Sequence, residues 1–222
     1  MTEARTTIFL VDDDVGVLKA LTILFDASGY DVQPFSSPRE FLSRHDASLP
    51  GCAVFDVSMP GLDGLELQEA LTGEHHERPV VFITGVGDIP TSVRAMRAGA
   101  VDFLTKPVSD GELLDAVERA TRQDAEVRKS RRELESINAR LARLSPRERE
   151  VLTHVVAGRL NKQIAYDLGT VLNTIKVHRG RIMRKLGVSS IADLVRLAER
   201  AGIQPPSRLP AGLPDDIEPK TN

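Results

Sequence analysis

Cysteine and long apolar runs are what this 222-residue chain has least of. Its single cysteine, Cys52, excludes an internal disulfide and a zinc site built from several thiolates. No apolar run approaches the roughly 20 residues of a membrane-spanning helix, and the first residues, MTEARTT, do not have the form of a signal peptide. With 41% hydrophobic and 27% charged residues, the sequence predicts a globular cytoplasmic protein without a membrane segment, in which Cys52 is a quiet core thiol.

Charge is unevenly distributed along the chain, although the net charge is only −3. Residues 1–122 hold 10 Lys and Arg against 20 Asp and Glu, a net charge of −10. Residues 143–204 hold 12 basic residues against 5 acidic ones, a net charge of +7. An acidic half joined to a basic half predicts two domains with different partners, and the basic half favours a polyanion.

Short apolar runs alternate with amphipathic stretches over residues 6–122. Such alternation predicts a parallel sheet covered by helices on both faces. Five βα units in this length predict an α/β doubly wound, flavodoxin-like domain with a five-stranded parallel sheet. The expected strands are 7–11, 31–33, 52–55, 79–83 and 101–104, and the expected helices lie near 15–28, 37–44, 64–72, 90–98 and 110–122.

The stretch after this domain, residues 123–144, contains neither Gly nor Pro. Val127, Leu134 and Leu141 recur every seven residues, and Ile137 and Leu144 form a second apolar row. The pattern predicts a helical linker that is either a short coiled coil or a single solvated helix with one apolar stripe.

The remaining sequence predicts a small all-α domain of four helices and a tail. The first helix begins at the capping signal Ser145-Pro146-Arg147-Glu148. The next helices are expected over Asn161–Leu168, from Thr174 to about Leu186, and over about Ser190–Arg200. The predicted domains are therefore 6–122, the linker 123–139, the helical domain 140–204, and a disordered tail, 205–222.

Polar residues follow four of the expected strands at the point where each strand ends. Asp12 and Asp13 follow the first strand, Asp56 the third, Thr84 the fourth and Lys106 the fifth. Because parallel strands deliver their C-terminal ends to one edge of a sheet, these side chains are expected to meet there. Three carboxylates suit Mg²⁺, which prefers oxygen ligands. One of them can then accept a phosphoryl group whose oxygens the cation, the ammonium and the hydroxyl neutralise.

The segments IFLVDDD, VFDVSMPGLDGLEL, VVFITG and AGAVDFLTKP resemble the receiver domain of two-component response regulators, over about residues 6–122. The resemblance implies that a sensor histidine kinase phosphorylates Asp56. It also implies that Asp13, Asp56 and the backbone carbonyl of Ser58 bind Mg²⁺ directly, while Asp12 acts largely through water.

By the same resemblance, phosphorylation changes a surface of the domain. Thr84 and Lys106 would contact the phosphoryl oxygens, and Phe103, the switch aromatic, would turn into the space that Thr84 leaves. The new surface would favour a homodimer. The residue after Lys-Pro, usually aromatic in this family, is Val108 here, a departure that affects packing rather than chemistry.

In the basic half, a short helix, a tight turn and a cation-rich helix suit the major groove of DNA, although charge alone also fits a solvated face. The segment LSPREREVLTHVVAGRLNKQIAYDLGTVLNTIKVHRGRIMRKLGV resembles the LuxR/FixJ-type helix-turn-helix domain, over about residues 140–202. This implies promoter half-sites of double-stranded DNA as the partner, with RNA polymerase as a further candidate. Gly180 stands where some relatives carry a side chain that reaches the groove. The implied base contacts are Lys176 and Val177, and the implied phosphate contacts are Thr174, Arg179, Arg181 and Arg184.

The sequence thus predicts a transcription regulator that catalyses only its own phosphorylation and dephosphorylation. One alternative is a haloacid-dehalogenase-like phosphatase with Asp56 as nucleophile. Such enzymes usually carry an Asp-x-Asp motif, and here Val57 and Ser58 supply no second acid. A third hypothesis is a protein-interaction module whose basic half binds an acidic partner, including the acidic half of the same chain.

Overall fold

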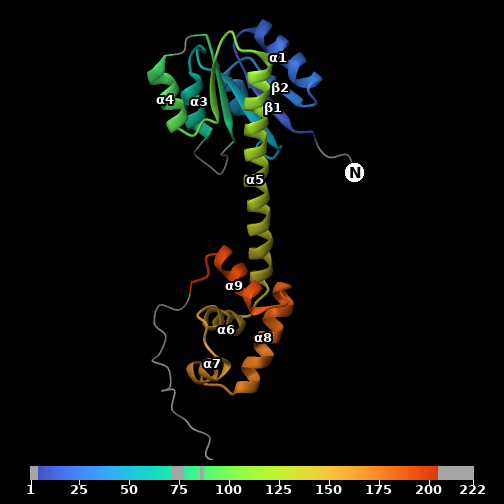
Figure 1. Ribbon diagram of the computed structural model, residues 1–222, viewed down its shortest axis with the longest axis vertical. Helices are drawn as coiled ribbons and strands as arrows, with labels where there is room; N and C mark the ends of the chain where they lie inside the picture. Colours follow the sequence, from blue (N-terminus) through green and yellow to red (C-terminus); the bar gives the residue numbers. More distant parts are fainter. Residues whose placement is uncertain (1–4, 72–77, 86–87, 205–222) are drawn as a thin grey trace, which may run out of the picture. The chain divides into compact units, whose positions relative to one another are not determined.

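The computed structural model describes residues 5–71, 78–85 and 88–204 (Figure 1). It divides between Lys129 and Ser130 into two compact parts, called here the N-terminal unit and the C-terminal unit. One helix, α5 (Asp110–Ala142), contributes residues to both. The tail 205–222, predicted to be disordered, lies outside the described residues. Within the described ranges, no helix is long and apolar enough to cross a membrane.

A five-stranded parallel sheet forms the centre of the N-terminal unit, in the order β2-β1-β3-β4-β5. This confirms the predicted doubly wound fold, and the observed strands begin and end within two residues of the predicted bounds. The three inner strands are buried along their whole length, which is why they appear in the sequence as continuous apolar runs. The strands are β1 (Thr7–Val11), β2 (Asp31–Phe35), β3 (Gly51–Asp56), β4 (Val80–Thr84) and β5 (Asp102–Thr105).

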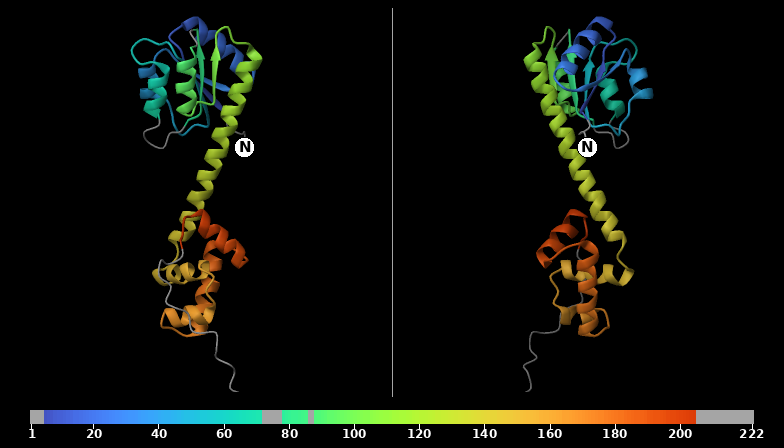
Figure 2. Two further views of the ribbon diagram at one scale, coloured as in Figure 1. Left: turned by 60° about the vertical axis from the view of Figure 1, so that its left-hand side comes forward. Right: turned by 90° about the vertical axis from the view of Figure 1, so that its right-hand side faces the viewer.

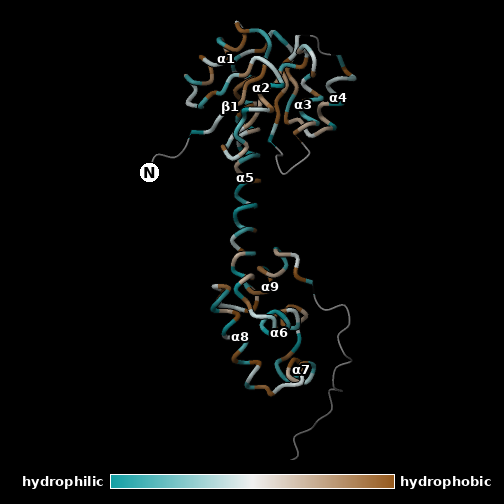
Figure 3. Tube along the Cα trace, turned by 180° about the vertical axis from the view of Figure 1, so that it is seen from behind, coloured by the Kyte–Doolittle hydropathy of each residue, from teal (hydrophilic) through white to brown (hydrophobic). Residues whose placement is uncertain are grey.

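Helices cover both faces of this sheet (Figure 2). The first turns of α5 pack with α1 on one face, where Leu18, Phe25 and Val117 join the core. The opposite face is covered by α2, α3 and α4, which bury Phe41 and Leu67 among others. The apolar strands carry brown, hydrophobic colours in Figure 3. The four helices beside α5 are α1 (Val15–Ala27), α2 (Pro38–Arg44), α3 (Gly64–Leu71) and α4 (Ile89–Arg97).

Two arginines hold residues 46–51, the connection into β3. Arg128 of α5 donates to three carbonyls of this stretch at 2.6–3.1 Å, and Arg78 donates to three at 3.2 Å. The carboxylate of Asp124, 5% exposed, accepts from the Gly51 N–H at 2.8 Å and from Arg128 at 2.7 Å. The part of α5 from Arg122 through Lys129 therefore packs within the N-terminal unit.

Over its described residues, which end at Gln204, the C-terminal unit is all-α, as predicted, with four helices after α5. The capping box between Ser145 and Glu148 is present at the start of α6. The third of these helices begins at Leu172, two residues before the predicted Thr174. The bounds are α6 (Pro146–Val156), α7 (Asn161–Asp167), α8 (Leu172–Leu186) and α9 (Ile191–Arg200).

The heptad residues of α5 have different surroundings. Ile137, Leu141 and Leu144, in or just after the last turns of this helix, are buried in the core of the C-terminal unit. Val127 and Leu134 stay 43% and 41% exposed. The second apolar row seen in the sequence is therefore used for packing within the chain, and an exposed stripe remains at the other two positions.

Candidate functional site

Three of the predicted site residues meet at the C-terminal edge of the sheet. Asp12 follows β1, Asp56 ends β3, and Lys106 follows β5. The Lys106 Nζ donates to Asp12 Oδ2 at 3.0 Å and to Asp56 Oδ1 at 2.8 Å. Groups 94 and 50 residues apart in sequence are brought together in this way, as expected from parallel strands that end at one edge.

Backbone N–H groups hold the other oxygen of each carboxylate. The N–H of Asp14 donates to Asp12 Oδ1 at 2.8 Å, and the N–H of Ser58 donates to Asp56 Oδ2 at 2.6 Å. Both carboxylates are buried, at 3% and 6% exposure. Each acid is thus fixed in orientation between an amide and the ammonium of Lys106, with no freedom to rotate without losing a hydrogen bond.

Burial and pairing shift two pKa values at this edge in the same direction. Burial raises the pKa of Asp12 above its ordinary value, against the opposing effects of the Asp14 N–H and Lys106. Burial alone would lower the pKa of Lys106, but hydrogen bonds and charge from Asp56 and Asp12 outweigh it, so this pKa is raised. The ammonium is therefore held positively charged at neutral pH.

The other predicted residues lie around these three with different exposure. Thr84 ends β4 and is fully buried, while the side chains of Asp13 and Ser58 are exposed. Phe103 in β5 is half-buried, its ring centroid 6.2 Å from that of Phe82. Asp14, the third acid of the first cluster, caps α1 by accepting from the N–H groups of Gly16 and Val17 at 2.7 and 3.2 Å.

The donor set at this edge fits a hard cation that keeps water ligands. In the part of the chain that the structure describes, no three His, Cys, Asp or Glu side chains are grouped closely enough to enclose a metal. Asp12 and Asp56 nevertheless lie close together, since both accept from the Lys106 ammonium, and each can supply only oxygen ligands to a metal. Mg²⁺ is usually held by one or two carboxylates together with several waters, so the residues present suit it better than a metal that needs a full protein cage.

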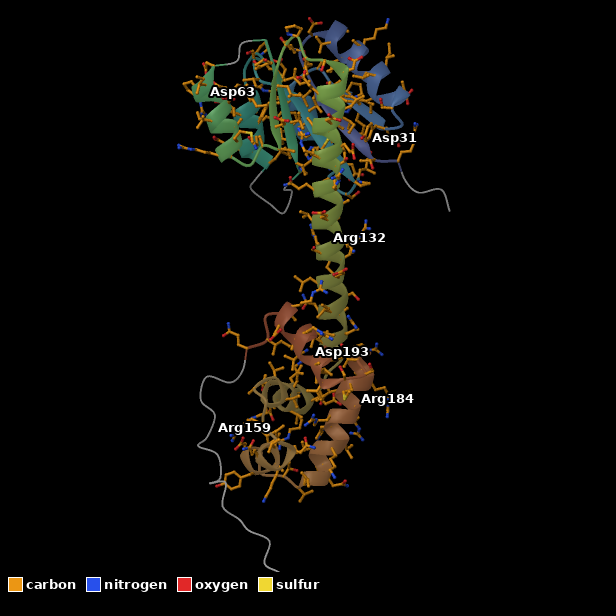
Figure 4. All side chains as sticks on the ribbon, in the orientation of Figure 1. Asp31, Asp63, Arg132, Arg159, Arg184 and Asp193 are labelled. Carbon is orange, nitrogen blue, oxygen red and sulfur yellow. The ribbon has the colours of Figure 1, made fainter. Side chains whose placement is uncertain are left out.

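A second candidate site is the outer face of α8. Ile175, Ile182 and Leu186 are fully buried and fix which side of the helix faces the core. Lys176, Val177, Arg181 and Arg184 are exposed, and Thr174 and Arg179 are half-buried. Arg184 lies on the side of α8 away from α6 and α7 (Figure 4).

The cations of α7 and α8 fall into two groups. Arg179 donates to Asn161 Oδ1, and Lys185 donates to Glu148 at 2.6 Å and to the Arg143 carbonyl at 3.1 Å. The cations of these two helices that have no ion pair or hydrogen bond within the described residues are Lys162, Lys176, Arg181 and Arg184.

This division adds to the sequence prediction. Arg179, predicted to contact phosphate, is engaged with the start of α7, so it also links the two helices. Lys162, which the sequence prediction did not include, is exposed on α7 and has no partner in the part of the chain that the structure describes. The only sequence signal for Lys162 was its charge at the second position of a short helix.

Family models match both units. The model described as "Response regulator receiver domain" matches residues 8–118. The model described as "Bacterial regulatory proteins, luxR family" matches residues 142–198. The first match includes Asp12, Asp56 and Lys106, and the second includes all of α8.

Curated relatives are similar over nearly the whole chain. Nodulation protein W of Bradyrhizobium diazoefficiens is 45% identical over 204 residues, 91% of this chain and 90% of that protein. Response regulator protein TodT of Pseudomonas putida is 43% identical over 200 residues, 90% of this chain and 88% of that protein. Transcriptional regulatory protein FixJ of B. diazoefficiens is 42% identical over 196 residues, 88% of this chain and 96% of that protein.

Solved structures of two similar proteins align with this chain. Response regulator StyR aligns with a TM-score of 0.82 at 44% identity, covering 89% of this chain and 100% of that one. Full-length FixJ from B. japonicum aligns with a TM-score of 0.55 at 42% identity, covering 89% and 97%. Each of these alignments covers 89% of the chain and therefore extends over both units.

Proposed function

The chain belongs to the two-component response regulators that join a receiver domain to a LuxR-type DNA-binding domain, and we propose that phosphorylation of Asp56 controls its action on DNA. It is a transcription regulator of the FixJ/LuxR type, a family whose partners are a histidine kinase and DNA. The observation that carries the proposal is the Lys106 ammonium, which lies 2.8 Å from Asp56 and 3.0 Å from Asp12.

Asp56 is the nucleophile in this proposal. Its carboxylate oxygen forms a bond to phosphorus as the bond between phosphorus and the donor's leaving group breaks, which leaves an acyl phosphate. Lys106, already at the site, and Thr84, buried at the end of the neighbouring strand, neutralise and bind the phosphoryl oxygens. In this proposal the domain catalyses only its own phosphorylation and dephosphorylation and turns over no other substrate.

Asp13, Asp56 and the Ser58 carbonyl would hold Mg²⁺, with Asp12 acting through water. When bound, the cation supplies charge neutralisation for the phosphoryl oxygens. Asp13 is suited to this because it is the exposed acid at the end of β1, next to Asp12. Lys106 occupies the space between Asp12 and Asp56 in the structure, so it sets how closely these two carboxylates approach each other.

Phe103 carries the change to the surface. A phosphoryl group adds about −1.5 to −2 charge and draws Thr84 towards it, and the ring of Phe103 moves from its place beside Phe82 into the space left behind. The altered face then pairs with a second copy of the chain. Two copies would place their α8 helices in half-sites about one DNA turn apart. We propose this action in the cytoplasm, with RNA polymerase as a further partner.

On α8, Lys176 and Val177 read base edges, and Thr174, Arg181 and Arg184 contact phosphates. Lys162 of α7 joins the phosphate contacts because it is exposed and no described residue pairs with it. Arg179, bound to Asn161, contacts phosphate while it positions α7 against α8. Exposed cations that have no partner among the described residues suit a partner with regularly spaced phosphates.

The first test is phosphorylation of the full chain by acetyl phosphate with Mg²⁺, followed by intact mass measurement. The wild-type chain should gain one phosphoryl group, and Asp56→Asn should gain none. Asp63→Asn is the matched control, since Asp63 follows the same strand but accepts the N–H of Glu66 at 2.7 Å at the start of α3. Labelling of Asp56→Asn equal to wild type would reject Asp56 as the acceptor.

The second test is recovery of duplexes from a random-sequence DNA library by the full chain, before and after acetyl phosphate. A common two-half-site sequence whose enrichment rises on treatment, and does not rise for Asp56→Asn, is the expected result. Enrichment that ignores treatment would leave a DNA-binding protein whose receiver does not control it. No enrichment in either state would favour an acidic protein partner for the basic half.

A further inference from the structure

Gly180 lies in the middle of α8, and nothing within the chain requires a glycine there. It is exposed, and a Cβ placed on it would meet no atom within 4 Å. Its backbone is helical and does not have the positive φ that favours glycine. At two other positions the reason for a glycine is plain: a Cβ at Gly51 would lie 1.7 Å from the Thr7 carbonyl oxygen, and Gly187 closes α8 with φ +66°.

A glycine inside a helix is unfavourable for the free protein. It loses more backbone freedom on folding than alanine does, and it offers no side chain to pack. Alanine at this position would meet no clash, so the local structure would favour it. Because the described part of the chain supplies no reason for Gly180, the reason is to be sought in what α8 binds.

The position of Gly180 on α8 says where that partner lies. Residues three and four apart share one face of a helix, so Lys176, Val177 and Arg184 surround Gly180. Lys176 and Arg184, one turn to either side, are two of the cations of α7 and α8 without a partner in the described ranges. Gly180 thus exposes backbone between two cations that have no partner in the described ranges, on the side of α8 opposite the buried Ile182.

We propose that Gly180 is the point of closest approach between α8 and the base edges of the major groove, and that its missing side chain determines specificity. This rests on the proposed DNA-binding function of α8. The major groove is about as wide as a helix with its side chains, about 12 Å, so a side chain at the centre of the inserted face sets how deep the helix goes. With glycine there, α8 lies deep enough for Val177 to touch a thymine methyl group and for Lys176 to reach guanine acceptors.

The test compares Gly180→Ala with the wild-type full chain on two DNA probes, after acetyl phosphate treatment with Mg²⁺. One probe is the duplex that the wild-type chain recovers from the random-sequence library, and the other is the unselected library itself. We expect Gly180→Ala to lose about tenfold or more in affinity for the recovered duplex, and to bind the unselected library within about twofold of wild type. Its melting temperature should equal or exceed that of the wild type.

Two further variants separate this proposal from a general effect of losing glycine. Gly111→Ala changes an exposed helical glycine in α5 that also has no atom within 4 Å of a Cβ, and it should bind both probes like wild type. Gly180→Leu should lose more affinity for the recovered duplex than Gly180→Ala, because the longer side chain holds the helix further out.

The outcomes are distinct. Equal affinity of Gly180→Ala and wild type for the recovered duplex would overturn the inference and leave DNA binding intact. A parallel loss on both probes, or a lower melting temperature, would also overturn it, because the glycine would then serve overall binding or folding. Failure of the wild-type chain to recover any sequence would reject the proposed function itself.

Discussion

The two units use their cations in opposite ways. In the N-terminal unit, Lys106 lies between two carboxylates, and Arg78 and Arg128 are bound to backbone carbonyls. In the C-terminal unit, Lys176 and Arg184 extend from α8 without a partner among the described residues. The contacts within the receiver site are made by residues of this chain, whereas in the proposed function the outer face of α8 is one half of an interface with DNA. The receiver site can be recognised from the ion pairs within it, and the outer face of α8 from cations that have no ion pair among the described residues.

The largest expected effect tests this contrast, because the C-terminal unit also contains ion pairs whose carboxylates are buried, at Asp167 and at Glu148. Arg159 and Asp167 form a bidentate ion pair at 2.8–3.1 Å, and the Asp167 side chain is only 1% exposed. Arg159→Ala removes the guanidinium from this buried carboxylate, which still has the His154 Nδ1 at 3.6 Å, and should cost about 3–5 kcal/mol in the free energy of unfolding. Urea unfolding and hydrogen exchange of the α6 and α7 amides measure this.

The control for that pair is Arg196→Ala. Arg196 pairs with Asp193 at 2.6 Å, but its side chain is 70% exposed, so the loss should be about 0.2–1 kcal/mol. Equal effects of Arg159→Ala and Arg196→Ala would mean that burial of the first pair does not govern its contribution.

The next largest effect concerns DNA binding by the cations of α8 that have no partner among the described residues. Lys176→Ala removes an unpaired cation, and binding to the recovered duplex should weaken by about 1–3 kcal/mol with no loss of folding stability. Arg184→Ala should weaken binding to all sequences alike and reduce its salt dependence. Gel-shift titrations at several salt concentrations measure both.

Lys185→Ala is the matched control, because Lys185 lies on the same helix but is bound to Glu148 and the Arg143 carbonyl. It should lower stability and leave the base preference unchanged. If Lys185→Ala and Lys176→Ala changed specific binding equally, internal pairing would not be what separates the two groups of cations.

A smaller effect concerns how much the burial of the Asp12 carboxylate destabilises the receiver. Burial raises the pKa of Asp12 above its ordinary 3.8. A carboxyl with a raised pKa in the folded state favours folding at pH below its unfolded pKa, and this contribution is lost as pH rises through the folded pKa. Without Mg²⁺, Asp12→Asn should therefore be more stable relative to wild type at neutral pH than near pH 3. Urea midpoints across this range test it, and a difference that did not vary with pH would contradict it.

The smallest effect is an absence of reaction in the native receiver. Burial raises the pKa of the Cys52 thiol to about 12, and the side chain is fully buried. A disulfide reagent at pH 8 should leave the native chain unlabelled and react when urea unfolds the N-terminal unit. Since Cys52 is the one cysteine of the chain, labelling reports on that unit alone. Rapid labelling without urea would mean that β3 opens readily.

Much of the receiver could be predicted because its sheet repeats one rule. The inner strands are continuous apolar runs, and residues at or just after the ends of parallel strands lie at one edge of the sheet, so Asp12, Asp56 and Lys106 could be placed together from the sequence. The errors lie at element ends. The second strand continues to Phe35 through Pro34, which lies in the edge strand β2, where a missing N–H is tolerated.

The polar contacts between distant segments could not be predicted. Arg179 had the same appearance in the sequence as Arg181 and Arg184, yet only Arg179 faces Asn161 of α7. Which cations are paired depends on how α7 packs on α8, and periodicity does not carry that information. Likewise, Asp14 is one of three adjacent acids in the sequence. Only the observed start of α1 shows that Asp14 caps this helix, whereas Asp12 faces Lys106.

The contacts of Arg128 and Asp124 with residues 46–51 decide where this chain can be cut. A receiver fragment that stops at Arg122, where its last helix was predicted to end, would lose the acceptor of the buried Gly51 N–H and the three hydrogen bonds that Arg128 gives to the neighbouring carbonyls. A fragment that continues through Lys129 keeps all of them. The seven residues 123–129 add nothing to the phosphorylation site. Without them the fragment has unsatisfied backbone groups at residues 47–51, and with them every one of these hydrogen bonds is kept.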